Sequence, residues 1–135
     1  MQRLAPLAAL LALAACSRPT DVAVQFHEAL ADGNGGKAFA LLSASTRAKL
    51  AEIAKRAHDE SGGAVSDDPA LMIAHGDPSL YPTPDGPEDK VASATLLAMD
   101  GARAKVSVRI GEAAHEMDLV RERGRWKIDL PLGSP

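Results

Sequence analysis

The sequence predicts an α+β fold in which N-terminal helices pack on a four-stranded antiparallel sheet. Over residues 20–58, apolar side chains recur at intervals of three and four, which is the period of an amphipathic helix. Over residues 90–130, apolar and polar side chains alternate, and three dipeptides with hairpin-turn chemistry divide the stretch into four strands. Strands joined by such short turns are neighbours, so the expected topology is a meander.

A short apolar segment precedes the expected domain. A single positive charge, Arg3, is followed by an apolar run over residues 4–15 and then by Cys16, the only cysteine of the chain. This is the layout of a secretory signal, with a charged region, an apolar region and a cleavage site of small residues. The twelve residues of the run are too few for a membrane-spanning helix, which needs roughly 20. We therefore expect an exported protein.

The stretch Leu13-Ala14-Ala15-Cys16 resembles the lipobox of bacterial lipoproteins, which has the form Leu-small-small-Cys. The resemblance implies that residues 1–15 are a signal peptide, that Cys16 is lipidated on its thiol, and that residues 16–19 are a short tether. It also implies that acyl chains on Cys16 hold the protein on a membrane of the bacterial envelope, facing the periplasm. Ser17 stands where Asp often marks retention at the inner membrane, which favours the outer membrane.

The composition excludes several classes of function. Without residues 1–15, the 15 basic residues fall to 14 against 18 acidic ones, because Arg3 is removed. This acidic balance argues against a general nucleic-acid binder. With Cys16 committed to lipid, the chain has no cysteine for a disulfide or a cysteine-based metal site. We expect no metal and no cofactor.

Three helical segments are expected before the sheet. Thr20 is a suitable N-cap for the first, which ends at the Gly-rich residues 33–36. A short second segment covers residues 37–42, and Ser43 caps a third that reaches about residue 58. The apolar stripes are Val22, Phe26, Ala29 and Leu30 in the first segment and Leu50, Ile53, Ala54 and Ala57 in the third.

Residues 58–89 form a long acidic connection. From residue 59 onward it holds eight acidic residues and no Lys or Arg. One short helix fits inside it, with Ser66 or Asp67 as its cap, Pro69 in its first turn and Gly76 as its stop. The carboxylates lack the spacing of a calcium-binding loop. A long connection of this kind is usually functional or mobile, and a basic partner is the interaction that its charge favours.

The last third of the chain predicts strands at residues 90–99, 102–110, 113–121 and 125–130. The turns between them are Asp100-Gly101, Gly111-Glu112 and Arg123-Gly124. Because two-residue turns fix the register, the numbers of paired residues should sum to 201, 223 and 247 across the three hairpins. This register places Lys105 opposite Asp118, a favourable pair, and Asp118 opposite Asp129. A single domain over residues 20–130 results, followed by a tail over residues 131–135.

Four packing motifs bear on the fold: Val22-Ala23-Val24-Gln25-Phe26, Ala29-Leu30-Ala31-Asp32-Gly33, Lys37-Ala38-Phe39-Ala40-Leu41-Leu42-Ser43 and Trp126-Lys127-Ile128. With the order of the elements, they resemble the cone-shaped fold of the nuclear transport factor 2-like superfamily, which includes small bacterial lipoproteins. The resemblance implies a curved sheet with a pocket at its open end. Superfamily members include isomerases, dehydratases, ligand binders and scaffolds, so the fold alone carries no activity. Such sheets often pair face to face, which leaves open a homodimer through the sheet with Leu96 on its outer face.

Three polar side chains interrupt the apolar inner face of the sheet on the predicted register: Ser93, Thr95 and His115. A mostly apolar cavity with a few polar groups is typical of a small-molecule site, in which His115 would hydrogen-bond a ligand. The structural alternative is a partly solvated histidine bonded to a neighbour. Arg121 opposite Trp126 predicts a cation–π pair that closes the hairpin, or an anion-accepting rim of the pocket.

No catalytic residue is predicted. Ser93 and His115 lie two strands apart on this register, roughly 9.5 Å, whereas a nucleophile and its base must lie about 3 Å apart. The isomerase-type sites of the superfamily use inward carboxylates or a tyrosine. Here the predicted inner face has no carboxylate, and the only tyrosine, Tyr81, lies in the acidic connection.

Taken together, these patterns predict a membrane-anchored binding or interaction module. Its ligand would be a small apolar molecule in the cone pocket or a protein partner in the envelope. An enzyme of the isomerase or hydratase type, working in the same pocket, is the alternative. The three residues between Cys16 and Thr20 span at most about 11 Å, so the domain is expected to lie close to the bilayer.

Overall fold

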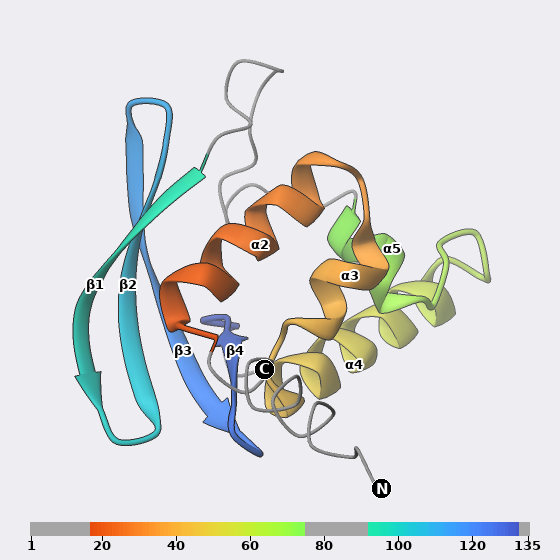
Figure 1. Cartoon of the computed structure of the whole chain (residues 1–135). Helices are drawn as coiled ribbons and strands as arrows, with labels where there is room; N and C mark the ends of the chain where they lie inside the picture. The colour runs from red at the N-terminus through yellow and green to blue at the C-terminus, as the bar shows by residue number, and fades with distance from the viewer. Residues whose placement is uncertain (1–16, 75–91, 133–135) are drawn as a thin grey trace, which may run out of the picture.

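The computed structural model describes residues 17–74 and 92–132, and it confirms the α+β arrangement (Figure 1). The elements are α2 (Pro19–Ala31), α3 (Gly35–Ala40), α4 (Ala44–Glu60), α5 (Pro69–Ala74), β1 (Ala92–Asp100), β2 (Arg103–Ile110), β3 (Ala113–Glu122) and β4 (Arg125–Asp129). The strand order β1-β2-β3-β4 is the expected antiparallel meander. The predicted lipidation site Cys16 and residues 75–89 of the acidic connection, with Gly76 and Tyr81, lie outside the described residues.

The helices begin at groups that satisfy free backbone amides. The expected cap Thr20 is wrong, because α2 begins one residue earlier, at Pro19, with Arg18 as its N-cap. Proline suits the first helical position, since it has no N–H to leave unpaired, and the Asp21 carboxylate accepts the Arg18 amide at 3.3 Å. Ser43 caps α4 as predicted, and its Oγ accepts the amide of Thr46 at 3.2 Å.

The short helices use other caps. Asn34 caps α3, where its side chain accepts the amide of Lys37 at 3.1 Å. At α5 the Asp68 carboxylate accepts the amide of Ala70 at 3.0 Å, in place of the expected Ser66 or Asp67. Asp and Asn serve these positions because their short side chains reach the first free amides of a helix.

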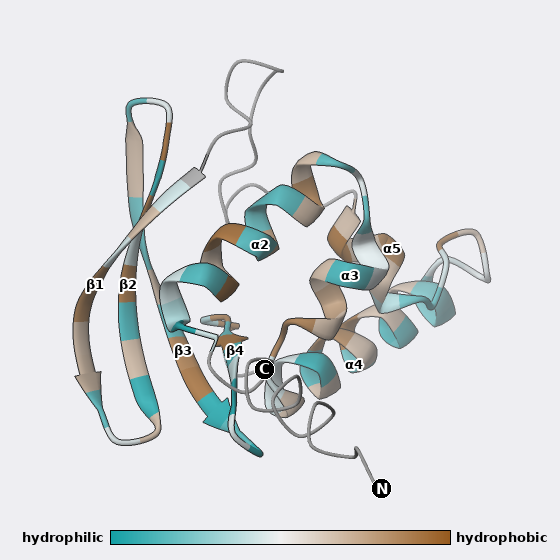
Figure 2. Cartoon of the chain, viewed as in Figure 1, coloured by the Kyte–Doolittle hydropathy of each residue, from teal (hydrophilic) through white to brown (hydrophobic). Residues whose placement is uncertain are grey.

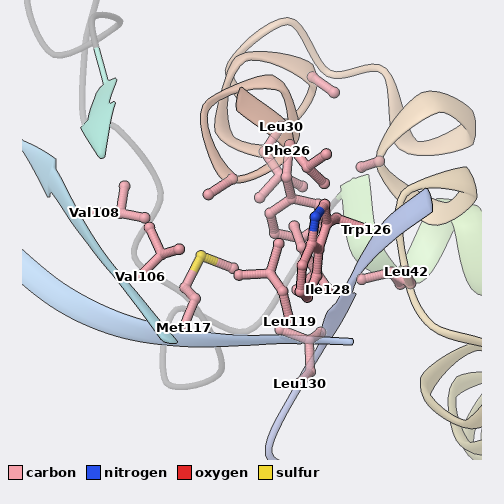
Figure 3. Close-up of a cluster of buried hydrophobic side chains, with 14 of the residues drawn as sticks. Phe26, Leu30, Leu42, Val106, Val108, Met117, Leu119, Trp126, Ile128 and Leu130 are labelled. Atoms are coloured by element: carbon pink, nitrogen blue, oxygen red, sulfur yellow. The ribbon is translucent and has the colours of Figure 1, made fainter. Parts of the chain in front are cut away.

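The core lies between α2 and the inner face of the sheet (Figure 1). Of the other helices, α3 packs against α2, α5 packs against α3, and α4 contacts α5 and β4. Brown, apolar segments of α2 and the sheet face one another in Figure 2. The side chains that meet there are Phe26, Leu30, Val106, Val108, Met117, Leu119 and Ile128, and each is at most 8% exposed (Figure 3). Leu132 is also buried, so the core extends past residue 130, where the domain was expected to end.

A backbone connection joins the helical layer to β4. The Ser43 amide donates to the carbonyl of Ile128, and the Ile128 amide donates to the carbonyl of Leu41, both at 2.8 Å. Leu42 thereby forms a short parallel bridge with Ile128. Both side chains are fully buried, so this bridge fixes the start of α4 against the last strand.

The register agrees with the prediction in two of the three hairpins. Pairs across β2–β3 sum to 223 and pairs across β3–β4 sum to 247, as expected. Lys105 forms the predicted ion pair with Asp118 at 3.9 Å. Asp118 does lie opposite Asp129, but Asp129 accepts hydrogen bonds from Ser43 and Thr46 and lies 4.0 Å from Arg103. These contacts offset the repulsion between the two carboxylates.

The predicted register of β1 on β2 is wrong. Asp100 pairs with Arg103, so the turn residues are Gly101 and Ala102 instead of the expected Asp100 and Gly101. Gly101 has a φ of 59°, which the first position of a tight hairpin turn requires. An irregularity between Leu96 and Ala98 then moves the pairing back by one residue, so that the paired numbers sum to 203 near the turn and to 202 beyond it, against the predicted 201.

Candidate functional site

The three polar residues predicted to share the inner face do not lie together. His115 pairs with the buried Val108 on the inner face, as predicted. Ser93 pairs with Arg109 and Thr95 with Ser107, so both lie on the outer face, where they are exposed. The corrected register of β1 is the reason, because a shift of one residue moves every side chain of a strand to the other face.

The corrected register also changes the face of Leu96, but from the predicted outer face to the inner face. Leu96 pairs with the buried Val106 and therefore lies on the inner side of the sheet, not on the outer face, although it remains 42% exposed. Leu97 and Met99 of the same strand are each 48% exposed. The apolar surface of β1 is thus half open to solvent, while the neighbouring β2 is alternately buried and exposed.

His115 meets a second histidine that the sequence analysis did not select. The ring of His27, on α2, lies 5.1 Å from that of His115 in an edge-to-face arrangement. His27 is 1% exposed, and neither of its ring nitrogens, nor Nε2 of His115, has a hydrogen-bond partner in the described part of the chain. His27 comes directly after Phe26 of the predicted apolar stripe, and this position was the sequence feature that could have indicated its burial.

Burial favours the neutral form of both imidazoles. Desolvation, followed by the proximity of His115, lowers the pKa of His27 to about 4, and desolvation lowers the pKa of His115 as well. No carboxylate among the described residues is hydrogen-bonded to either ring to orient it for proton transfer. The pair therefore acts as part of the packing between α2 and the sheet.

A cavity of about 430 Å³ lies between the start of α4 and the β3–β4 hairpin. We call it the basic cavity, and its lining residues are Ala44, Arg47, Glu122, Arg123, Arg125 and Lys127. The Leu42–Ile128 bridge brings its two walls together, and Lys127 adds a hydrogen bond at 2.8 Å to the carbonyl of Ala40. The β3–β4 end of the sheet is correspondingly hydrophilic in Figure 2.

The basic cavity has an excess of positive charge. Four of its side chains are cationic and one, Glu122, is a carboxylate. Glu122 is already engaged, because its two oxygens accept the amide of Ala44 at 3.1 and 3.3 Å, at the N-terminus of α4. Within residues 17–74 and 92–132, none of the four cations forms an ion pair. An anion is the ligand that such an arrangement favours.

Two of the cations show the effect of this excess directly. Nε of Arg47 is buried and has no hydrogen-bond partner among the described residues. The pKa of Lys127 is lowered, first by desolvation and then by the charges of Arg47 and Arg125, while Glu122 acts in the opposite direction. A bound oxyanion would relieve both conditions by accepting from Arg47 and by offsetting the repulsion at Lys127.

A second cavity, of about 220 Å³, shares Arg125 and Lys127 with the basic cavity. Its other lining residues are Ser17, Val22, Gln25, Leu41, Gly124 and Trp126. The predicted cation–π pair is confirmed beside it, with the guanidinium carbon of Arg121 at 4.8 Å from the ring centroid of Trp126. Arg121 is exposed, whereas Trp126 is 5% exposed, so the pair covers the indole from solvent.

Arg123 and Gly124 form the predicted turn, and the cluster of charge around them was not predicted. Residues 121–127 contain four basic side chains, and this local density of positive charge was the sequence feature that could have indicated a basic site. Arg47 comes from a distant helix, and only the tertiary structure places it in the basic cavity.

Comparison of the chain with protein-family models, with curated proteins and with solved structures finds no match. In the part of the chain that the structure describes, no helix has the length and apolar character needed to cross a membrane. No group of three or more His, Cys, Asp or Glu side chains in that part is placed to hold a metal ion.

Proposed function

We propose that the protein is a lipid-anchored protein of a bacterial envelope and that its domain is a binding module for an anionic group. The observation that supports binding is the basic cavity, in which four cations lack ion pairs among the described residues. The motif Leu13-Ala14-Ala15-Cys16 supports the anchor. A binding role is favoured over an enzymatic one because the two residues of the lining that could act as a base, Glu122 and Lys127, are already hydrogen-bonded to the backbone at Ala44 and Ala40.

The chemistry of the lining favours an oxyanion such as a phosphate. Arginine presents a planar fork of donors that matches two oxygens of a phosphate or carboxylate, and three of the four cations are arginines. Arg47 and Lys127 are partly buried, whereas Arg123 and Arg125 are exposed at the entrance. This gradient lets an anion enter past the exposed pair and reach the desolvated one, where electrostatic attraction is stronger.

Inorganic phosphate tests the binding proposal. In the full chain solubilised in detergent, phosphate at ten times its dissociation constant should stabilise the fold by about 1.4 kcal/mol relative to chloride at equal ionic strength. That corresponds to a rise of about 4 °C or more in Tm, measured by the fluorescence of Trp126, the only tryptophan. The double variant Arg123→Gln/Arg125→Gln should lose the rise.

A matched control removes the same charge elsewhere. Lys37 on α3 and Arg109 on β2 are both exposed and lie outside the basic cavity, so Lys37→Gln/Arg109→Gln should keep the phosphate effect. Equal loss in both double variants would show that net charge, not the cavity, is responsible, and the binding proposal would fail. Mass spectrometry of the chain isolated from membranes tests the anchor separately, since an unmodified Cys16 rules it out.

A further inference from the structure

The first described residue of the domain lies beside the basic cavity. Ser17 lines the second cavity together with Arg125, Trp126 and Lys127, two of which also line the basic cavity. The start of α2 lies next to β4, which it contacts (Figure 1). Cys16 is bonded to Ser17, and consecutive Cα atoms are about 3.8 Å apart. The proposed point of lipid attachment is therefore covalently adjacent to this end of the sheet.

We infer that the basic cavity binds the anionic headgroups of the bilayer that holds the anchor, so that the β3–β4 turn rests on the membrane surface. The inference rests on the proposed function and names its ligand class, the phosphate of an anionic lipid. Arg123 and Arg125 are exposed at the turn, where they can meet headgroups at the surface. Arg47 and Lys127, deeper in the cavity, would take the phosphate oxygens of one lipid.

The distribution of charge in the domain would orient it relative to the membrane. Without residues 1–15 the chain has 14 basic and 18 acidic residues, a net charge of −4, so an anionic membrane repels the domain as a whole and attracts only its basic end. Arg18 and Asp21, which are close to the anchor in the sequence, neutralise each other in an ion pair at 3.3 Å. Electrostatic attraction of this kind acts only within a Debye length, about 8 Å at physiological ionic strength, and the anchor keeps the basic end within that range.

A lipid is favoured over a soluble anion because of where the anchor places the domain. Attachment beside the cavity makes headgroup binding effectively intramolecular, so that even a weak site is occupied at the high local concentration of lipid. A soluble phosphate compound gains nothing from the position of Ser17. A soluble ligand is thus the alternative that the experiment must distinguish.

Energy transfer from Trp126 to a dansyl-labelled headgroup tests the inference. The full chain, isolated from membranes, is reconstituted into vesicles of phosphatidylcholine alone or of phosphatidylcholine with phosphatidylglycerol. We expect stronger transfer with phosphatidylglycerol, because the basic end is drawn to the surface, and loss of the difference in 1 M salt, where the Debye length is about 3 Å. Each basic residue near an anionic surface contributes about fivefold, so Arg123→Gln/Arg125→Gln should weaken the dependence on phosphatidylglycerol by tenfold or more.

The control variant Lys37→Gln/Arg109→Gln should transfer energy as the unmodified sequence does. Transfer that is independent of phosphatidylglycerol, or that falls equally in both double variants, overturns the inference. If phosphate still raises Tm through Arg123 and Arg125 in that case, the proposed binding function stands and its ligand is a soluble anion. If phosphate has no effect either, both the inference and the proposed function fail.

Discussion

The first and last hairpins of the sheet have turns of the same length but differ in how they are held. In β3–β4, the strand β4 exchanges backbone hydrogen bonds with Leu41 and Ser43 on its other side, and Ile128 is fully buried. In β1–β2, the strand β1 contains an irregularity, and its apolar side chains Leu96 and Met99 are nearly half exposed. A third segment fixes β4 and forms the basic cavity, whereas β1 has no comparable described partner beyond β2 and α2.

The largest effect that separates the two hairpins is expected from their apolar side chains. Ile128→Ala should lower the free energy of unfolding by about 3 kcal/mol, because it leaves a cavity in a fully buried position. Leu96→Ala should cost about 1 kcal/mol or less, since the side chain is 42% exposed. Urea unfolding of the two variants, followed by Trp126 fluorescence, measures both. Equal costs would contradict the proposed difference between the hairpins.

The two hairpins also differ in how far the sequence predicts them. Arg123 and Gly124, with φ values of 52° and 78°, form the expected turn, and every pair of β3–β4 follows from it. In β1–β2 two glycine-containing turns were available, one residue apart, and the hairpin chemistry of the dipeptide Asp100-Gly101 favoured the wrong one. No local sequence pattern predicts the irregularity between Leu96 and Ala98, because it depends on how the whole strand packs.

The residues of the candidate site differ in the same way in how far the sequence predicts them. The cation–π pair of Arg121 and Trp126 was predictable, because both residues belong to one hairpin with a fixed turn. The basic cavity was not, since Arg47 reaches it only through the bridge between Leu42 and Ile128. Partners within a hairpin follow from turn chemistry, whereas partners from a separate helix depend on tertiary packing.

The pH dependence of stability is the next effect, and it tests the packing between α2 and the middle of the sheet. His27 has a pKa of about 4 in the folded chain against 6.5 when unfolded, so between these values only the unfolded chain binds the proton. Stability should therefore fall as the pH falls from about 7 to 4 and then level off, with a total loss of about 3 kcal/mol from this residue. About 2 kcal/mol of this loss of unfolding free energy should occur between pH 7 and pH 5.

The variant His27→Phe isolates this contribution. Its phenyl ring fills a similar volume and does not titrate, so the difference in unfolding free energy between variant and unmodified chain should change with pH by that amount. Carboxylates titrate in both proteins and cancel in the difference. A constant difference from pH 7 to pH 5 would show that the folded chain accommodates a charged His27, and the account of the histidine pair would be wrong.

The smallest expected effect compares the two turns themselves. Gly101 and Gly124 have φ values of 59° and 78°, and a Cβ added at either would meet nothing within 4 Å. Gly101→Ala and Gly124→Ala should therefore each cost about 1 kcal/mol, from backbone conformation alone. Equal losses of unfolding free energy would place the difference between the hairpins in the strands and not in their turns. A Gly101→Ala cost near zero would instead mean that the first hairpin adjusts its backbone to the new side chain. Such an adjustment is open to β1, an edge strand whose side chains are half exposed, and is closed to β4, because the bridge to Leu42 holds that strand in place.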